Sequence, residues 1–145
     1  PLRLEEDRLS LVKGIKENLI DVIVSDHIPE DEESKRLPFS QAATGAIGIE
    51  TLLPLALEMH HNESLPLNKI IETLTINPAK ILQINKGTLA KGSDGDICIL
   101  DLDAPWVVEA EKLKSKSKNT AIEGRKLQGK VLMTFLNGEL VFSNK

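Results

Sequence analysis

Hydrophobic residues recur at helical spacing near the start of the chain. Three acids at residues 5–7 precede apolar residues that follow one another at mixed three- and four-residue steps as far as Ile15. Acidic side chains in a first turn and an apolar stripe behind them are typical of an amphipathic helix. The pattern therefore predicts a helix that begins at the acids and ends near Asn18.

A short β-branched run, DVIVSD at residues 21–26, comes next. Its apolar residues do not alternate with polar ones, which is typical of a strand covered on both faces in a parallel α/β sheet. We therefore expect a buried strand over residues 21–26, as half of a βα unit. The strand ends on Asp26, and a carboxylate at the end of an apolar segment is costly unless it has a partner.

A long polar segment, residues 28–44, separates this strand from the next apolar stretch. A loop of this length in a compact domain is usually functional or disordered. Three helices are predicted after it, from the apolar stretches TGAIGIETLLPLALEMHH, SLPLNKIIETLT and NPAKILQI.

Prolines mark where these helices should begin. Pro54 comes early enough to be tolerated in a first turn or to cause a mild kink. Pro66 and Pro78 stand where a first helical residue would, and Asn77 is a plausible cap.

The last third of the chain has strand patterns instead. The apolar run ICIL at residues 97–100 follows several turn residues, and KVLMTFLNGELVF contains two β-prone runs around Asn137-Gly138. An Asn-Gly pair between such runs predicts a hairpin. We therefore divide the chain into βα units over residues 1–84 and a β-rich appendage over residues 85–145.

Composition narrows the classes of function. The 145 residues are 41% hydrophobic and 28% charged with a net charge of -4, which fits a globular domain and gives nucleic-acid binding no electrostatic support. No run approaches the roughly 18 apolar residues of a membrane span. The single cysteine, Cys98, excludes an internal disulfide, fits a reducing cytoplasm and is expected in the strand core. No signal peptide is visible, and a first residue of Pro1 indicates a truncated or processed chain.

Two places could carry chemistry. Asp26 would lie at the C-terminal end of a barrel strand, where α/β barrels build their active sites, and could bind a metal ion and move a proton. The alternative is that Asp26 only caps its loop through backbone N–H groups. Thr44 and Gly45 precede a helix and could offer N–H groups to an anion, although glycine turns are common.

The other polar clusters have simpler explanations. His27 is a single histidine and is weak evidence for a metal ligand. His60 and His61 end a helix, where a positive charge is favourable, but adjacent residues point apart and make a poor metal pair. The acids at residues 30–33 and the alternating lysines at residues 112–118 fit solvated loops.

The order of several segments resembles the C-terminal part of the dihydroorotase family, cyclic amidohydrolases of the amidohydrolase superfamily. The resemblance runs from Pro1 to about Phe142 and implies an α/β fold, the C-terminal portion of a TIM-type (β/α)₈ metallo-hydrolase barrel followed by part of a small β-sandwich appendage. The segments are PLRLEEDRLSLVKGI, DVIVSDHIP, PFSQAATGAIGIETLLPL, TINPAKIL, GTLAKGSDGDICILD and SKSKNTAIEGRKLQGKV with NGEL.

The resemblance also implies a reaction and a cofactor. It implies zinc-dependent interconversion of dihydroorotate and N-carbamoyl-L-aspartate in cytoplasmic pyrimidine biosynthesis. Asp26 would bind zinc and act as general base and acid, and Thr44 and Gly45 would contact substrate through their backbone.

Two departures from the family pattern matter. The family continues D-H-A-P-H and binds substrate with the second histidine, whereas Glu30 stands there and would repel a dianion. The family's H-x-H metal pair, its other metal ligands and its remaining substrate-binding residues are absent, and a complete barrel needs roughly 250 residues. We therefore expect the remainder of its own barrel to be a partner, the chain alone to be inactive, and its exposed strand edge to favour homo-oligomers.

Two alternatives stay open. The first is a non-catalytic dihydroorotase-like structural or assembly protein, which Glu30 favours. The second is another cyclic amidohydrolase that acts on allantoin or a hydantoin, against which the E-T-L-L-P-L and N-T-x-x-x-G segments argue.

Overall fold

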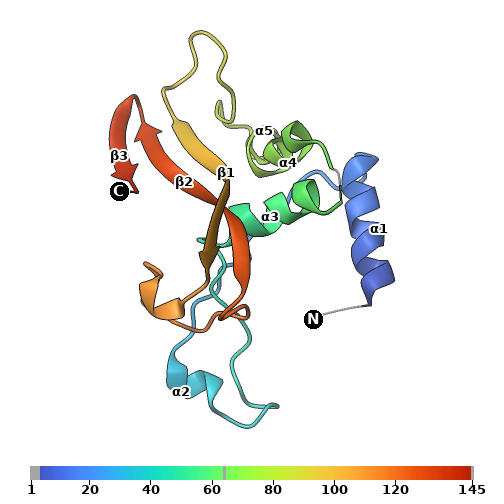
Figure 1. Ribbon diagram of the computed structural model, residues 1–145, viewed down its shortest axis with the longest axis vertical. Helices are drawn as coiled ribbons and strands as arrows, with labels where there is room; N and C mark the ends of the chain where they lie inside the picture. Colours follow the sequence, from blue (N-terminus) through green and yellow to red (C-terminus); the bar gives the residue numbers. More distant parts are fainter. Residues whose placement is uncertain (1–3, 64, 145) are drawn as a thin grey trace.

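A helical first part and an antiparallel sheet make up the chain (Figure 1). The computed structural model describes residues 4–63 and 65–144. Helix α3 lies between α1 and the sheet, and α2 projects on a long loop at the opposite end from the 86–96 loop (Figure 1). In chain order the elements are α1 (Glu5–Lys16), α2 (Glu32–Lys35), α3 (Leu52–His61), α4 (Leu67–Leu74), α5 (Ile76–Ile81), β1 (Ile97–Val107), the 3₁₀ helix η1 (Ala110–Lys112), β2 (Lys126–Leu136) and β3 (Glu139–Ser143).

The first predicted helix is confirmed as α1. Its first turn carries the three acids, which favour the positive end of the helix dipole. The chain leaves the helix at Asn18, whose φ of 60° turns the backbone into the left-handed region. Ile15 is buried against Ala56, Leu65 and Ile70, so α1 is fixed to the other helices by its apolar stripe.

The strand expected over residues 21–26 is not formed. The segment is extended, and its one ladder-type contact among the described residues is the parallel bridge between His27 and Ala46. Val24 is 71% exposed, so the segment is not covered on both faces. A parallel strand needs hydrogen-bonded neighbours along its length, and the described residues supply that pairing only at the end of the run.

Helices α3, α4 and α5 confirm the three predicted helices but shift two of their starts. Pro54 is the third residue of α3 and sits in the first turn, where the missing N–H has no intrahelical partner in any case. Pro66 precedes α4, and Pro78 is the third residue of α5 rather than the first. Asn77 lies inside α5, and its side-chain amide donates to the Asp21 carbonyl at 2.9 Å instead of capping the helix.

The predicted hairpin is confirmed. Strands β2 and β3 pair antiparallel, with Leu136 opposite Glu139, and β1 pairs with the other edge of β2. Asn137 and Gly138 have φ values of 52° and 82°, the pair of positive angles that a two-residue type I′ turn requires. The helical part touches this sheet through α3 and β2, where a Cβ on Gly129 would lie 2.5 Å from Leu57 Cδ1.

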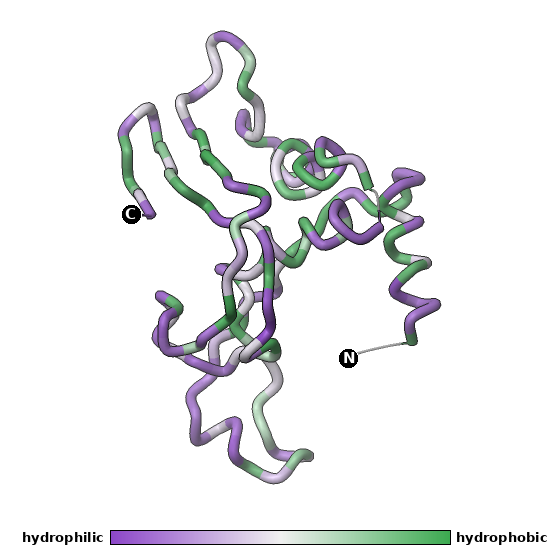
Figure 2. Tube along the Cα trace, viewed as in Figure 1, coloured by the Kyte–Doolittle hydropathy of each residue, from purple (hydrophilic) through white to green (hydrophobic). Residues whose placement is uncertain are grey.

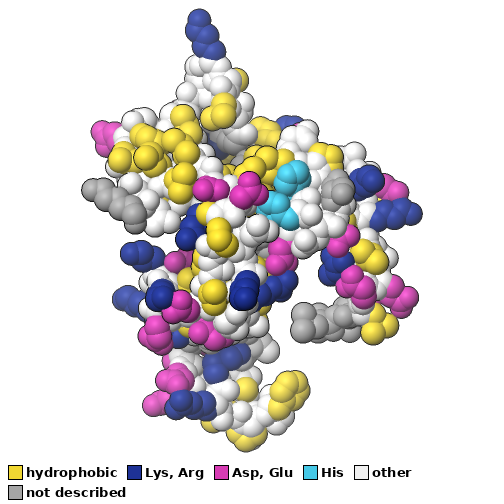
Figure 3. Space-filling model, viewed as in Figure 1, with side chains coloured by type: hydrophobic (Ala, Val, Ile, Leu, Met, Phe, Trp, Pro, Cys, Tyr) yellow, Lys and Arg dark blue, Asp and Glu magenta, His cyan; other side chains and the backbone are white. Residues whose placement is uncertain are grey.

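Cys98 is exposed, which contradicts its expected place in a strand core. Its neighbours Ile97 and Ile99 on β1 are also 40% and 43% exposed. The reason is that a three-stranded sheet has two faces, and α3 covers only part of one. Figure 2 shows that hydrophobic positions continue along β1, β2 and β3, and Figure 3 shows apolar side chains gathered on this part of the surface.

These uncovered apolar side chains predict self-association of the isolated chain. Large exposed patches in a monomer mark interaction or aggregation surfaces. On β3 they include Leu140, Val141 and Phe142, and two side chains outside the sheet, Val24 and the fully exposed Phe39, add to them. Analytical ultracentrifugation should therefore find dimers or larger species at micromolar concentration. A monodisperse monomer that unfolds cooperatively would contradict this prediction.

An ion-pair network joins the 86–96 loop to the hairpin turn. Lys86 Nζ lies 2.7 Å from Asp94 Oδ2 and 2.6 Å from Asp96 Oδ2. The other oxygen of Asp96 accepts a hydrogen bond from Asn137 N at 2.8 Å. This backbone hydrogen bond, followed by the bond to Lys86, holds the pKa of Asp96 below its ordinary value.

The network predicts a loss of order at acid pH. A carboxylate whose pKa is lower in the folded state stabilises that state above its unfolded pKa of about 3.9, and the contribution disappears as the pH falls through the lower folded pKa. The protection of the Asn137 amide against exchange, relative to its intrinsic rate at the same pH, should therefore fall below that range. An Asp96→Asn variant should exchange faster at neutral pH and lose this acid step, whereas Asp103→Asn, on the exposed bulge of β1, should keep it.

Candidate functional site

The segment after Asp26 and the glycine-containing turn before α3 lie side by side. His27 and Ala46 form a parallel bridge, and Ile28 N donates to the Ala46 carbonyl at 3.0 Å. Two segments that are about twenty residues apart in sequence therefore meet where the expected strand was to end. The contact brings the Asp26 backbone next to the Gly45–Ala46 peptide.

Asp26 is exposed at the rim of a hollow of about 460 Å³ that Gly45 also lines. Its φ of 45° lies in the left-handed region, which aspartate tolerates better than most residues. The loop-cap alternative requires a backbone N–H that donates to the Asp26 carboxylate. Within residues 4–63 and 65–144 no such bond is formed, and Asp26 is exposed to solvent beside the hollow.

Most residues that line the hollow are apolar, with Ser25 and Thr51 as polar exceptions besides Asp26. Ile23, Leu55, Ala56 and Met59 line it from the extended segment and from α3, together with Ala121 and Ile122 from the segment before β2. A carboxylate at the mouth of an apolar hollow is favourably placed for binding and proton transfer, because a site of this kind excludes water once a ligand fills it.

His27 has a structural task that the sequence did not reveal. Its Nδ1 accepts hydrogen bonds from Gly48 N at 3.1 Å and from Ile49 N at 3.3 Å. A ring nitrogen that accepts N–H groups carries no proton, so the proton of the neutral imidazole is on Nε2. Neither nitrogen then offers a free lone pair to a metal ion, and His27 instead ties the strand end to the turn before α3.

Gly45 and Gly48 allow this close approach. Gly45 has a φ of 128°, and a Cβ there would lie 2.7 Å from Ile28 Cγ2 and 2.8 Å from the Ile28 carbonyl oxygen. A Cβ on Gly48 would lie 2.8 Å from the carbonyl oxygen of Ser25. Both glycines are therefore required by geometry, which a glycine pattern alone did not establish.

Thr44 and Glu30 lie outside the lining of the hollow. Thr44 is exposed beside Gly45, while Glu30 is half-buried. Glu30 is held through its backbone: its N–H donates to Asn119 Oδ1 at 3.4 Å, and its carbonyl accepts the Ser117 hydroxyl. The structure thus brings Asp26 and Gly45 to one hollow and places Thr44 next to it, but it does not place Glu30 there.

The acidic run is partly structural. Asp31 caps α2, since its Oδ1 accepts the Ser34 N–H at 2.8 Å. The Ser34 backbone and hydroxyl hydrogen bonds hold the pKa of Asp31 below its ordinary value. Two further contacts were missed from sequence: the Lys35 ammonium and the Asn119 amide both bond to the Gly45 carbonyl, at 2.9 Å and 3.2 Å.

The other two histidines each lie against a backbone carbonyl, which the sequence did not predict. His60 Nδ1 lies 2.8 Å from the Leu65 carbonyl, and His61 Nε2 lies 3.1 Å from the Leu102 carbonyl of β1. Across the described residues, no group of three or more His, Cys, Asp or Glu side chains is placed to hold a metal ion. In the same residues, every helix is too short or too polar to cross a membrane.

Known proteins are similar to this chain in sequence and in fold. The sequence profile of the Amidohydrolase family matches residues 2–141. Dihydroorotases of Ehrlichia chaffeensis and Anaplasma phagocytophilum are 46% and 44% identical over 142 residues, which covers 98% of this chain and 32% of each relative. The solved L-hydantoinase (dihydropyrimidinase) of Arthrobacter aurescens matches with a TM-score of 0.90 and 34% identity, over 99% of this chain and 33% of that chain. The chain thus spans about a third of the length of these proteins.

Proposed function

This chain belongs to the amidohydrolase family, and we propose that it is the part of a dihydroorotase that supplies the proton-transferring carboxylate. The observation that carries the proposal is Asp26, an exposed carboxylate without a hydrogen bond from the described residues, at the mouth of the hollow that Gly45 lines. The choice of substrate rests on the dihydroorotase relatives, which align with almost the whole chain.

The residues present fit a zinc site only in part. A free carboxylate oxygen is a suitable ligand, and Asp26 offers one, whereas His27 uses its Nδ1 on backbone N–H groups. Zinc needs about four ligands, and the described residues contain no cluster of three. Most ligands would therefore come from outside this chain. When bound, zinc would polarise the ring amide and lower the pKa of water.

The chain's own residues would move a proton and position substrate. Asp26 would accept the proton of the attacking water and return it to the ring nitrogen of dihydroorotate as the amide bond breaks. In the reverse direction the same carboxylate would serve closure of N-carbamoyl-L-aspartate. Thr44 and Gly45 would orient substrate through their backbone. We place this reaction in cytoplasmic pyrimidine biosynthesis.

The proposal extends to the organisation of the chain. Residues 1–84 would complete a TIM-type barrel, in which the extended segment 21–26 gains neighbours on both sides and becomes a strand. Residues 85–145 would form part of a β-sandwich whose open face needs a cover. The chain alone would be inactive, because catalytic groups that act as a unit fail together.

A hydantoinase-type activity is the second candidate. The fold match to the L-hydantoinase supports it, since dihydroorotate and hydantoins are both cyclic amides. A non-catalytic assembly protein is the third candidate, and the acid at Glu30 favours it. Substrate preference distinguishes a dihydroorotase from a hydantoinase-type enzyme. Bound zinc distinguishes both enzymes from a non-catalytic assembly protein.

The full-length gene product, purified with zinc, tests these candidates directly. We expect a zinc-containing protein with an H-x-H pair after its first barrel strand, turnover of N-carbamoyl-L-aspartate and dihydroorotate, and much slower turnover of hydantoin. Faster hydantoin hydrolysis would favour the second candidate. A protein without the H-x-H pair, zinc or turnover would favour the third.

Glu30 gives a sharper test of substrate recognition. If position 30 faces substrate in the complete enzyme, Glu30→His replaces a repulsive charge by a donor for the dianion, and the apparent KM should fall about tenfold, which corresponds to about 1.4 kcal/mol. Glu33→His, on the exposed face of α2, is the matched control and should leave KM unchanged. An equal KM in wild type and Glu30→His would place this position outside the substrate site.

A further inference from the structure

Side chains from two separate segments donate hydrogen bonds to backbone carbonyl groups at the Thr44–Gly45 turn. Lys35, at the end of α2, directs its ammonium to the Ala43 carbonyl at 2.7 Å and to the Gly45 carbonyl at 2.9 Å. Asn119, in the segment between η1 and β2, donates its side-chain amide to the same Gly45 carbonyl at 3.2 Å. The Gly45 oxygen therefore uses both of its lone pairs on side-chain donors.

Asn119 also connects three segments that are far apart in sequence. Its Oδ1 accepts the Glu30 N–H at 3.4 Å and the Ser117 hydroxyl. Its backbone carbonyl accepts the Ile47 N–H at 3.2 Å, next to a parallel bridge between Ile47 and Thr120. One asparagine thus links the segment before β2 to the loop that follows Asp26 and to the glycine turn.

The contact of Lys35 fixes the direction of the turn's peptide groups. In a planar trans peptide the C=O and the following N–H point in opposite directions. Because the Ala43 carbonyl faces Lys35, the N–H of Thr44 points away from α2. An ammonium bound to carbonyl oxygens forms charge-assisted hydrogen bonds, which are stronger than neutral ones and resist displacement by water.

We propose that Lys35 and Asn119 are positioning residues, which clamp the Ala43 and Gly45 carbonyls on either side of Thr44 so that the Thr44 N–H faces substrate beside Asp26. The inference rests on the proposed substrate role of this turn. Both side chains are half-buried and bonded to backbone, so they act through the turn rather than on the reacting atoms.

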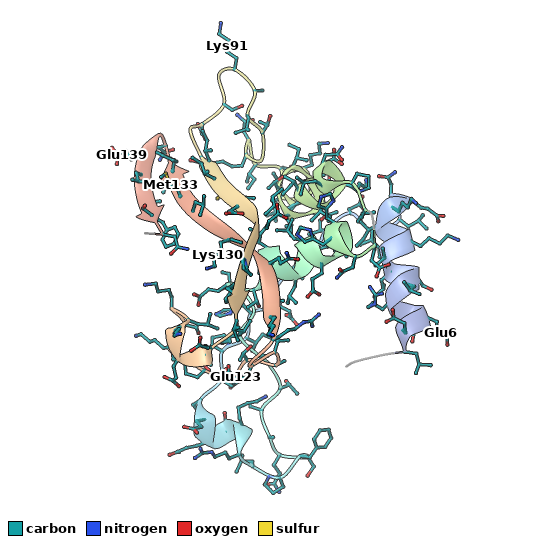
Figure 4. All side chains as sticks on the ribbon, in the orientation of Figure 1. Glu6, Lys91, Glu123, Lys130, Met133 and Glu139 are labelled. Atoms are coloured by element: carbon teal, nitrogen blue, oxygen red, sulfur yellow. The ribbon has the colours of Figure 1, made fainter. Side chains whose placement is uncertain are left out.

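The test compares single variants of the full-length zinc-loaded protein. Lys35→Met and Asn119→Ala remove one donor each, and the double variant removes both. Lys35→Arg keeps the positive charge. Two matched controls remove the same types of side chain from exposed positions: Lys91→Met, at the loop tip labelled in Figure 4, and Asn144→Ala, after β3. The measurements are KM and kcat for dihydroorotate and amide exchange over residues 28–47.

We expect each single variant to raise KM about tenfold, equivalent to about 1.4 kcal/mol, with kcat within a factor of about three. Exchange should accelerate over residues 43–47 in the variants and not in the controls. Lys35→Arg should recover most of the affinity, and the double variant should lose less than the sum of the two single losses, since both donors hold one carbonyl.

Four outcomes decide against the clamp. Unchanged exchange over residues 43–47 overturns it whatever the activity. Faster exchange with wild-type KM shows a purely structural contact and overturns the positioning role. A wild-type protein that turns over no dihydroorotate overturns the proposed function, and the clamp's role in that reaction with it. If the wild type is active and Asn119→Ala has the wild-type KM, the clamp is overturned but the proposed function is not.

Discussion

Asp26→Ala in the zinc-loaded full-length enzyme should lower kcat by a factor of about 10³ or more, since a positioned general acid or base alone contributes about 10²–10⁴. Asp26→Asn should lose nearly as much, because an amide keeps the shape of the side chain but accepts no proton at neutral pH. Asparagine also tolerates the left-handed φ of 45° at this position, so the loss would not follow from backbone strain. Steady-state kinetics with dihydroorotate measure both effects.

Two controls separate proton transfer from metal loss and misfolding. Zinc content should be determined for each variant, and kcat compared at full metal loading. Asp21→Asn removes an exposed carboxylate from the other end of the same segment and should keep wild-type kcat. Because Asp26 bonds to no described residue and asparagine tolerates its φ of 45°, Asp26→Asn at full metal loading should unfold near the wild-type temperature. A fully loaded Asp26→Ala enzyme with wild-type kcat would remove the general-base assignment.

Local patterns predicted the parts of the fold that local interactions determine. Helix α1 and the Asn137-Gly138 hairpin were both found where the sequence placed them. A dipole, an apolar stripe or a pair of positive φ angles is encoded within a few consecutive residues, so one sequence suffices to find it. Helix α4 begins one residue after Pro66. Helix α5 begins two residues before Pro78, because a proline in a first turn costs no intrahelical hydrogen bond.

The predictions failed where the structure of a segment depends on contacts with residues distant in sequence. Residues 21–26 have the composition of a buried strand, yet a strand exists only where a neighbour completes its ladder, and the described residues provide one bridge at His27. Cys98 has apolar neighbours in the sequence, but in the structure its side chain is exposed. Composition reports what a segment could bury, and the rest of the fold determines whether it does.

Two of the residues predicted for the candidate site lie close together, but the contacts that support them were not predicted. Asp26 and Gly45 were identified from sequence and lie at one hollow. The contacts that hold the turn were not visible, since Asn119 lies 74 positions from Gly45 and belonged to no catalytic pattern. The sequence offered only weak evidence that His27 is a metal ligand, and in the structure its Nδ1 accepts a hydrogen bond from the Gly48 backbone N–H. Side chains that bond to distant backbone have no spacing that a single sequence reveals.

Gly45→Ala should be the most damaging substitution outside the proton-transferring group. The backbone φ of 128° is rarely adopted by residues with a side chain, at a cost of about 1–3 kcal/mol. The added methyl would also lie 2.7–2.8 Å from the side chain and carbonyl oxygen of Ile28. The turn must therefore move away from the strand end, and displacements of about 1 Å at a substrate-positioning group cost about 10² in kcat/KM.

Comparison with Gly124→Ala separates the steric collision from the backbone strain. Gly124 also has a positive φ, 74°, but an added Cβ there would have no neighbour within 4 Å. Its variant carries backbone strain without the collision, so it should lower thermal stability slightly and leave kcat/KM within a factor of about two of wild type. If Gly45→Ala loses no more kcat/KM than Gly124→Ala, the contact between the turn and Ile28 does not position substrate. A loss confined to Gly45→Ala, with zinc retained, makes the separation between the turn and the strand end a determinant of substrate affinity.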